Sequence, residues 1–375
     1  MKIGIITFSA SSNCGSMLQA YALQEILKRK YNADVNLINF ANRGSRNIYG
    51  LIDWELNRLA IRRNLNTLRH LPTFFQSKRD YTAFANVYLN NTQKKYRSEA
   101  MLRGIERNYD ILIAGGDQVW NVRCSDADDA FFLSFAKDVR KVAYAPSLGG
   151  SNIFKYANDV ERYKKYLLDF EKLSVREPNG KKWLEQLTSR EVPIIADPTL
   201  LLTQQEWTGW LPVPEVQGKY IFNYAFYHNH KETNQALQKI SNKTGMPIFV
   251  MDIKSWAFYH LDRYGIRKYG RTGPLAFLGL MKNASLIMTQ SFHGTLFSAL
   301  FNKPFWSYNW LEFAHSEDDR ATAILNQFGM PERYQLVNNL IDMNVMEPID
   351  YADCNQRIER LRATAFDFID SFINK

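Results

Sequence analysis

The chain has 375 residues, a formal net charge of +9, and 46% hydrophobic and 14% aromatic residues. This length exceeds one ordinary hydrophobic core, so two domains are expected, and the composition excludes a long disordered chain. Three widely separated cysteines exclude a disulfide framework and offer no paired metal-ligand spacing. The amino terminus lacks the features of a signal peptide, and no stretch approaches the roughly 20 apolar residues of a membrane span, so we expect a cytoplasmic protein without a metal.

Much of the positive charge lies between Arg43 and Ile105, where 12 Lys/Arg against 4 Asp/Glu give a net +8 (12 minus 4) among several aromatic residues. One interpretation is a solvated helical insertion whose aromatic side chains pack on the parent domain. A second is a basic surface in peripheral contact with an anionic membrane at its inner face. Nucleic-acid binding is not expected, because no recognisable nucleic-acid module is present.

The first half of the chain predicts a parallel α/β domain. An apolar run at residues 2–8 is typical of a buried parallel strand, and apolar residues at helical spacing begin at Met17 after a small-residue loop. The next apolar strand, at residues 34–40, completes the strand–loop–helix–strand unit of a doubly wound sheet. Further strands are expected at residues 109–115, 140–149 and 172–177.

The second half repeats this alternation after a crossover at residues 192–202, so the fold class is α/β with two doubly wound Rossmann-like domains facing a cleft. Gly245 is expected to stop one of its helices, and Pro274 to begin another. The strands of this half are expected at residues 219–227, 246–253 and 285–291, and its helices at 230–245, 273–284 and 293–303. The expected domains are 1–190 (acceptor side, with the insertion 43–105), 191–345 (donor side) and a helix at 346–375 that packs back.

Ligands of doubly wound sheets bind beyond the carboxyl ends of the strands, where loops and helix amino termini converge. The loop SNCGS places Gly15 and Ser16 at the start of a helix, where backbone N–H groups suit an anion or a sugar hydroxyl. The alternative is an ordinary helix cap. Cys14 in the same loop has no sequence neighbour that would activate it as a nucleophile.

The loop GGDQVWN, residues 115–121, follows an apolar strand with two glycines that let the backbone approach a ligand closely. The carboxylate of Asp117 and the amides of Gln118 and Asn121 bind hydroxyl groups, and the face of Trp120 packs on a sugar ring. We therefore expect a sugar-binding platform, with a turn that buries Trp120 in the core as the alternative.

Two further strand ends carry a cation or a titratable ring. Arg176 in SVRE is suited to bidentate binding of a carboxylate or phosphate, with a surface network to Glu177 as the alternative. His293 in QSFHG stands at the start of a helix, where it can act as acid, base or phosphate ligand. The alternative is a structural histidine that caps the turn.

Five segments follow one another along the chain: SNCGSMLQAYALQ, ILIAGGDQVWN, LSVREPNG, ADPTLLL and GPLAFLGLMKNASLIMTQSFHGTLFSALFNKPF. In this order they resemble the polysaccharide pyruvyl transferase family, over roughly Ile3 to Phe305. The resemblance implies a two-domain fold like that of the GT-B glycosyltransferases, and transfer of pyruvate from phosphoenolpyruvate to a sugar such as galactose, usually as a cyclic ketal. Members of the family act on lipid-linked oligosaccharides, on secondary cell-wall polymers or on glycoprotein glycans. Because no secretory signal is visible, we expect a lipid-linked oligosaccharide acceptor in bacterial exopolysaccharide or capsular polysaccharide biosynthesis. Phosphoenolpyruvate is the co-substrate, and no cofactor is implied.

The resemblance also implies roles for single residues. His293 matches a family histidine beside the donor phosphate and is the candidate acid, and Asp117 is the candidate that orients or deprotonates an acceptor hydroxyl. The expected donor-binding residues are Arg176, Ser291, Phe292, His293 and Gly294. The expected acceptor-binding residues are Asn13, Gly15, Ser16, Gln19, Gln118, Trp120 and Asn121.

One position departs from the family pattern. Several members carry an arginine two residues before the histidine, where this chain has Ser291, so we expect Lys303, Arg320 or Arg271 to supply a donor cation. Two other functions stay open, because a fold does not determine an activity. One is a GT-B glycosyltransferase that uses a nucleotide sugar, although no clear carboxylate pair for a ribose is visible. The other is a non-catalytic carbohydrate-binding protein, which the missing arginine favours.

Overall fold

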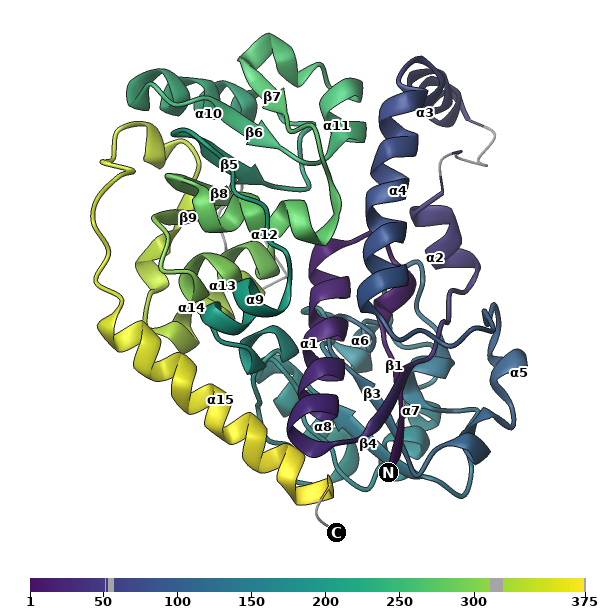
Figure 1. Ribbon diagram of the computed structural model, residues 1–375. Coiled ribbons are helices and arrows are strands. Elements are labelled where there is room, and N and C mark those ends of the chain that lie inside the picture. Colours follow the sequence, from purple (N-terminus) through teal and green to yellow (C-terminus); the bar gives the residue numbers. More distant parts are fainter. Residues whose placement is uncertain (51, 53–56, 311–319, 374–375) are drawn as a thin grey trace. The chain divides into compact units, whose positions relative to one another are not determined.

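The computed structural model describes residues 1–50, 52, 57–310 and 320–373 of the chain. Within these ranges the chain forms two compact units, each built around one parallel β-sheet (Figure 1). The expected α/β class with two parallel sheets is confirmed, whereas a cleft between two domains stays a prediction. The first unit contains Met1–Tyr49, Ala83–Thr203 and Glu359–Lys375, and the second contains Gly50–Thr82 and Gln204–Ile358.

Four strands form the sheet of the first unit: β1 (Lys2–Ile6), β2 (Asp34–Leu37), β3 (Ile111–Gly115) and β4 (Arg140–Tyr144). They lie in the order β2-β1-β3-β4, and each neighbouring pair is parallel. The two central strands, β1 and β3, are buried along almost their whole length, which is typical of parallel strands covered on both faces. Burial on both faces requires continuous apolar residues, and these apolar runs made β1 and β3 recognisable in the sequence.

The prediction of a strand at residues 172–177 is wrong. Only two isolated bridges form there, one between Lys172 and Val142 and one between Val175 and Ile194. Between them, the hydroxyl of Ser174 donates to the carbonyl of Ala143 and accepts from the amide of Ala145. A side chain therefore takes part of the role that a backbone ladder would have in a regular strand.

The helices of the first unit follow the expected alternation. The longest begins after Asn13, whose side chain accepts from the amide of Ser16, and ends at Asn32, which adopts a left-handed conformation. The helices are α1 (Cys14–Tyr31), α2 (Arg43–Ile48), α5 (Glu99–Leu102), α6 (Ile153–Tyr156), α7 (Val160–Leu168) and α8 (Pro178–Thr188). Short 3₁₀ turns cover Phe8–Ala10, Ile105–Asn108, Asp129–Phe132 and Pro198–Leu201.

Six strands form the sheet of the second unit: β5 (Ile221–Tyr224), β6 (Ile248–Val250), β7 (Ile266–Lys268), β8 (Leu286–Thr289), β9 (Phe305–Asn309) and β10 (Tyr334–Leu336). Their order is β10-β9-β8-β5-β6-β7, and all pairs are parallel. The side chains of Ile221, Leu286 and Ile248 are fully buried in its core. This alternation of strands and helices is the one that the sequence predicted.

The helices of the second unit confirm two sequence signals. One ends at Gly245, which adopts the left-handed conformation expected of a helix stop, and another carries Pro274 in its first turn. The helices are α3 (Arg58–Arg69), α9 (Gln204–Trp210), α10 (Lys231–Thr244), α11 (Ile253–Phe258), α12 (Gly273–Asn283), α13 (Phe292–Leu300) and α14 (Arg320–Phe328). The 3₁₀ turns are Leu261–Tyr264, Pro331–Arg333 and Asn339–Ile341. In the part of the chain that the structure describes, no helix has the length and apolarity needed to cross a membrane.

Residues 43–105, expected as one insertion in the first domain, are divided between the two units. Helices α2 and α5 belong to the first unit, whereas α3 and most of α4 (Leu71–Tyr88) belong to the second. On α4, the carboxylate of Asp80 accepts from the amide of Thr272 at 3.0 Å and pairs with Arg271 at 2.9 Å. These contacts explain why this part of the segment groups with the second sheet.

The carboxyl-terminal helix α15 (Ala352–Ile373) has residues in both units, and its last part packs on the first (Figure 1). Arg362 donates through Nε to the carbonyl of Leu200 at 2.7 Å, and Arg140 donates to the carbonyl of Phe372 at 2.8 Å. Leu200 lies in the segment 192–202, which was expected as a crossover and groups with the first unit up to Thr203.

Each sheet has one position where the order of its strands reverses. In the first sheet, β2 lies on one side of β1 and β3 on the other; in the second, β6 lies on one side of β5 and β8 on the other. Loops at the carboxyl ends of such strands diverge and leave a crevice, where ligands of open parallel sheets bind. The loop after β3 begins with Gly116 and Asp117, and the loop after β8 leads to His293.

Candidate functional site

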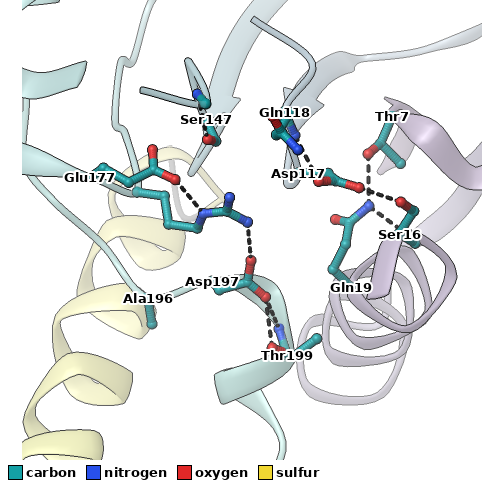
Figure 2. A network of polar contacts seen from close by, with 12 residues as sticks. Thr7, Ser16, Gln19, Asp117, Gln118, Ser147, Glu177, Ala196, Asp197 and Thr199 are labelled. Carbon is teal, nitrogen blue, oxygen red and sulfur yellow. Dashed lines mark hydrogen bonds and ion pairs between the residues drawn. The ribbon is translucent and has the colours of Figure 1, made fainter. Parts of the chain in front are cut away.

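Asp117 is held in a fixed orientation at the switch point of the first sheet. Gly116 and Asp117 both adopt left-handed backbone conformations, with φ of +66° and +48°. The Ser16 hydroxyl donates to Asp117 Oδ2, and the backbone amide of Gln118 donates to Oδ1 at 2.8 Å (Figure 2). The amide of Ser147 donates to the Asp117 carbonyl at 2.7 Å. A non-glycine residue in this conformation is uncommon, so the surrounding bonds maintain a shape that points the carboxylate at the start of α1.

Gln19 supports this arrangement from within the core. It was expected to contact the acceptor, but its side chain is fully buried. Its Nε2 donates to Thr7 Oγ1 at 2.8 Å and to the Ser16 carbonyl at 2.9 Å (Figure 2). A Cβ atom on Gly116 would lie 1.6 Å from Gln19 Oε1. Gln19 therefore positions Ser16, and glycine at position 116 is required by both conformation and space.

The other acceptor candidates fall into two groups. Asn121 Nδ2 donates to Gln118 Oε1 at 3.0 Å, which pairs the two amides as expected for neighbours in one loop. Asn13 and Gly15 flank the start of α1, where Asn13 caps the helix and Gly15 is buried in its first turn. These residues lie at the carboxyl edge of the first sheet, beside the loop that holds Asp117.

The prediction that Trp120 offers its face to a sugar is wrong. Its side chain is only 1% exposed, and its indole N–H donates to the carbonyl of Phe131 at 3.0 Å. The ring stacks on Phe132 with centroids 5.2 Å apart and meets Phe170 edge-on. Burial of a large aromatic ring with a satisfied polar edge is stabilising, and it leaves no ring face for a ligand.

Arg176 lies in a buried network with two carboxylates rather than in the surface network considered as the alternative. The Arg176 side chain is 2% exposed, and its Nε and Nη1 contact Glu177 Oε1 at 2.8 Å and Asp197 Oδ2 at 2.7 Å. Figure 2 labels both carboxylates. Asp197 also accepts from the amide and hydroxyl of Thr199. Burial alone would lower the pKa of Arg176, but the two carboxylates raise it overall.

This network, here called the Arg176 triad, contains Arg176, Glu177 and Asp197. It combines one positive and two negative formal charges, so its cation is already compensated. Binding of the donor by Arg176 stays a prediction, and such binding has to compete with both carboxylates.

Two residues beside Asp117 were missed by sequence reasoning. Burial, and then the charges of Asp117 and Asp126, raise the pKa of Tyr49, so its phenol stays protonated at neutral pH. Burial also raises the pKa of Asp126, whose carboxylate accepts from the Ser45 hydroxyl at 3.2 Å. Tyr49 is far from Asp117 in the chain, and no local pattern joins the two. The run of acidic residues around Asp126 was the one available signal.

His293 is the second residue of α13, as predicted, and follows the switch-point strand β8. Its side chain is 7% exposed, and the ring meets Phe292 at right angles with centroids 5.2 Å apart. The backbone amide of Ser291 donates to Thr289 Oγ1 at 3.0 Å. A Cβ atom on Gly294 would lie 2.1 Å from the same Thr289 oxygen, so only glycine lets the helix start this close to the strand.

Side chains that the sequence did not single out extend the second-unit site. The loop after β5 is joined to the loop after β8 because the Tyr227 amide donates to Gln290 Oε1 at 3.1 Å. The His230 ring stacks on Trp310, at the end of β9, with centroids 3.6 Å apart. Tyr227 and Trp310 are 58% and 36% exposed, so aromatic surface is available beside this switch point. His228 is buried, and its ring contacts the carbonyl of Ala225 at 3.0 Å, so it is structural.

The three candidates for the missing donor cation lie at different edges of the second sheet. Lys303 precedes β9 and donates to the carbonyl of Lys282 at 2.9 Å, so it lies at the amino edge, away from His293. Arg271 follows the outermost strand β7 and pairs with Asp80. Arg320 begins α14, the helix that follows β9, and β9 is the neighbour of β8. Position therefore disfavours Lys303, and Arg320 is the candidate nearest in topology to His293.

Two α/β units, each with a parallel sheet and a polar loop at its switch point, are typical of two-domain GT-B-like proteins. The structure is similar over its whole length to S. aureus MnaA with UDP (TM-score 0.55, 11% identity, 97% of that chain). It is similarly related to UDP-N-acetylglucosamine 2-epimerase from Rickettsia bellii (TM-score 0.51, 12% identity, 100% of this chain and 97% of that one). At these identities the likeness shows the fold alone, and it confirms the GT-B-like expectation.

The family model described as polysaccharide pyruvyl transferase matches residues 13–312. The match covers 300 of the 375 residues, so the chain belongs to the polysaccharide pyruvyl transferase family. No curated protein matches the sequence at a significant level.

Proposed function

We propose that the protein transfers the pyruvyl group of phosphoenolpyruvate to two hydroxyls of one sugar as a cyclic ketal. The observation that carries this proposal is the placement of its two candidate reactive groups. Asp117 and His293 each follow the strand that borders the switch point of its own sheet, where ligands of open parallel sheets bind. Family membership supplies the donor and the general acceptor class. The proposed acceptor is a lipid-linked oligosaccharide for a bacterial surface polysaccharide, pyruvylated on a hexose such as galactose in the cytoplasm.

The proposed reaction needs two proton transfers and one leaving group. The methylene carbon of phosphoenolpyruvate takes a proton and becomes a methyl group, which leaves an oxocarbenium-like carbon next to the carboxylate. One sugar hydroxyl adds to this carbon, the bond to the phosphate oxygen breaks, and a second hydroxyl closes the ring. Of the two hydroxyl protons, one balances the proton taken by the methyl group and one leaves with phosphate.

In this proposal the second unit holds the donor. The first turn of α13 presents backbone N–H groups and the positive end of its dipole, which favour a phosphate beside His293. A bound phosphate in turn favours the protonated imidazole, which then donates to the donor. Ser291, Phe292 and Gly294 shape this turn, and Arg320 is the proposed cation in place of the arginine that position 291 lacks.

The first unit then holds the acceptor. Asp117 is proposed to accept a hydrogen bond and then a proton from the attacking hydroxyl, because Ser16 and the Gln118 amide fix its carboxylate without neutralising it. Tyr49, kept protonated by its surroundings, is proposed to donate a hydrogen bond to the sugar. Gln118 and Asn121 provide further amide groups for hydroxyls.

The test combines phosphate release with mass spectrometry of lipid-linked oligosaccharides after incubation with phosphoenolpyruvate. His293→Ala should lower phosphate release by about 100-fold or more, while the matched variant His260→Ala should keep the wild-type rate. Asp117→Asn should lower turnover with little change in phosphoenolpyruvate affinity.

Near-normal release in His293→Ala would overturn the role of the histidine. Transfer from a UDP-, GDP- or CMP-sugar, without use of phosphoenolpyruvate, would favour the glycosyltransferase alternative. Sugar binding with no phosphate release would favour the non-catalytic one.

A further inference from the structure

Helix α3 exposes an apolar face to solvent. Ile61, Leu65 and Leu68 are 58%, 61% and 65% exposed. Their spacing of four and three residues places them on one side of the helix, and we name them the α3 stripe. Isolated exposed apolar residues are ordinary, but three large ones in a row on one helix face indicate a contact surface.

The exposed face is not the result of a poorly packed helix. Asn57 caps α3 by accepting from the amide of Ala60 at 2.8 Å. Ala60 and Thr67, seven residues apart, are buried and form a separate face. The guanidinium of Arg62 lies 4.9 Å from the ring centroid of Phe258 on α11, which also contacts α3. The helix therefore has one face packed on the second unit and another face open to solvent.

Every charged side chain of α3 is positive. Residues 58–79 contain six Lys/Arg and no Asp/Glu. Four of the six lie on α3, and three of these four, Arg58, Arg62 and Arg69, are close to the stripe in helical position. The pKa of His70, directly after α3, is lowered by burial and by the charges of Lys268 and Arg69. Lys268 comes from β7, so the cationic character extends beyond the helix itself.

We infer that the α3 stripe docks on the surface of an anionic lipid bilayer. An apolar helix face bordered by arginines is the pattern of a helix that lies in the membrane interface, with the apolar side chains in the acyl boundary and the cations among lipid phosphates. Each Lys or Arg near an anionic leaflet adds electrostatic attraction to the lipid phosphates. A second copy of the chain fits less well, because two such faces would bring their arginines together. This inference rests on α3 alone and does not depend on the proposed reaction.

The experiment is co-flotation of the full chain with vesicles of phosphatidylcholine, with and without phosphatidylglycerol. The wild-type protein should bind the anionic vesicles, and added salt should weaken the binding. Leu65→Ser/Leu68→Ser should lower the partition coefficient at least about tenfold, while the matched exposed leucine variant Leu168→Ser on α7 should leave it unchanged.

A second pair of variants tests the contribution of the arginines to vesicle binding. Arg58→Gln/Arg69→Gln should lower partition at least about fivefold, whereas Arg360→Gln on the exposed part of α15 should have no effect. Circular dichroism checks that each variant is folded. Equal binding by wild type and Leu65→Ser/Leu68→Ser would overturn the inference. So would a wild-type dimer, measured by light scattering, that becomes a monomer in the same variant without any vesicle binding.

Discussion

Removal of Asp197 from the Arg176 triad should be among the most damaging single changes in the first unit. Asp197→Ala removes the acceptor of Arg176 Nη1 at 2.7 Å, of the Thr199 amide at 2.9 Å and of the Thr199 hydroxyl at 2.7 Å. Arg176 and Asp197 are 2% and 0% exposed, so water cannot replace the lost partner. Breaking such a buried pair costs about 3–5 kcal/mol. For a unit of roughly 150–250 residues this corresponds to a fall in Tm of about 6–20 °C.

Thermal unfolding followed by far-UV circular dichroism measures this fall. The matched control is Asp353→Ala, which removes an ion pair of the same 2.7 Å length to Arg357 on α15. That pair is 43% and 63% exposed, so its loss should cost less than about 1 kcal/mol. Asp197→Asn should lower Tm by an amount between those of Asp197→Ala and Asp353→Ala, because the amide keeps an acceptor for Thr199 but loses the negative charge. If Asp197→Ala and Asp353→Ala lowered Tm equally, the triad would not be the buried ion network described above.

Three further changes probe the site. Gly116→Ala should destabilise by about 2–5 kcal/mol in thermal unfolding, because the new methyl group meets Gln19 Oε1 and the left-handed backbone is strained; an unchanged Tm would show that Gln19 moves freely. Asp126→Asn should raise Tm at pH 7, because burial raises the pKa of Asp126 and its ionisation therefore costs stability above that pKa. The gain in Tm should vanish when the pH falls to about the ordinary aspartate pKa of 3.8, and a gain that persists at that pH would contradict burial as the cause. Arg320→Ala should raise KM for phosphoenolpyruvate about tenfold or more, whereas Lys303→Ala should leave KM within about twofold, and the reverse order would identify Lys303 as the donor cation.

Most of the architecture could be predicted because local signals and global fold agree. Continuous apolar runs predicted the buried parallel strands, and Gly245 and Pro274 marked helix ends by conformational preferences that need no tertiary context. The position of His293 at the start of α13 followed from the same pattern. The strand expected at 172–177 failed because Ser174 pairs with the neighbouring backbone through its side chain, a contact that no period in the sequence reveals.

The candidate site was predictable as a set of loops but not as a set of contacts. Trp120 and Gln19 have residue types that suit a sugar, yet each is buried by partners distant in the chain, Phe132 for the indole and Thr7 for the amide. Tyr49 was missed because a tertiary contact that the sequence does not reveal brings it near Asp117. The residue types at a strand end therefore identify the edge of the sheet that carries the site. The direction in which each side chain points is set by packing and is not visible in the sequence.

The Arg176 triad also limits how the proposed donor can be bound. A donor with a carboxylate and a phosphate is strongly anionic, and the triad brings two carboxylates with its one cation. Attraction to Arg176 is therefore opposed by Glu177 and Asp197 at similar distances, and the net field of the triad disfavours an anion. A donor that contacts Arg176 must displace one of these partners or bring a proton to it. The alternative is that the positive field comes from elsewhere, which is why the start of α13, His293 and Arg320 carry the donor in the mechanism proposed above.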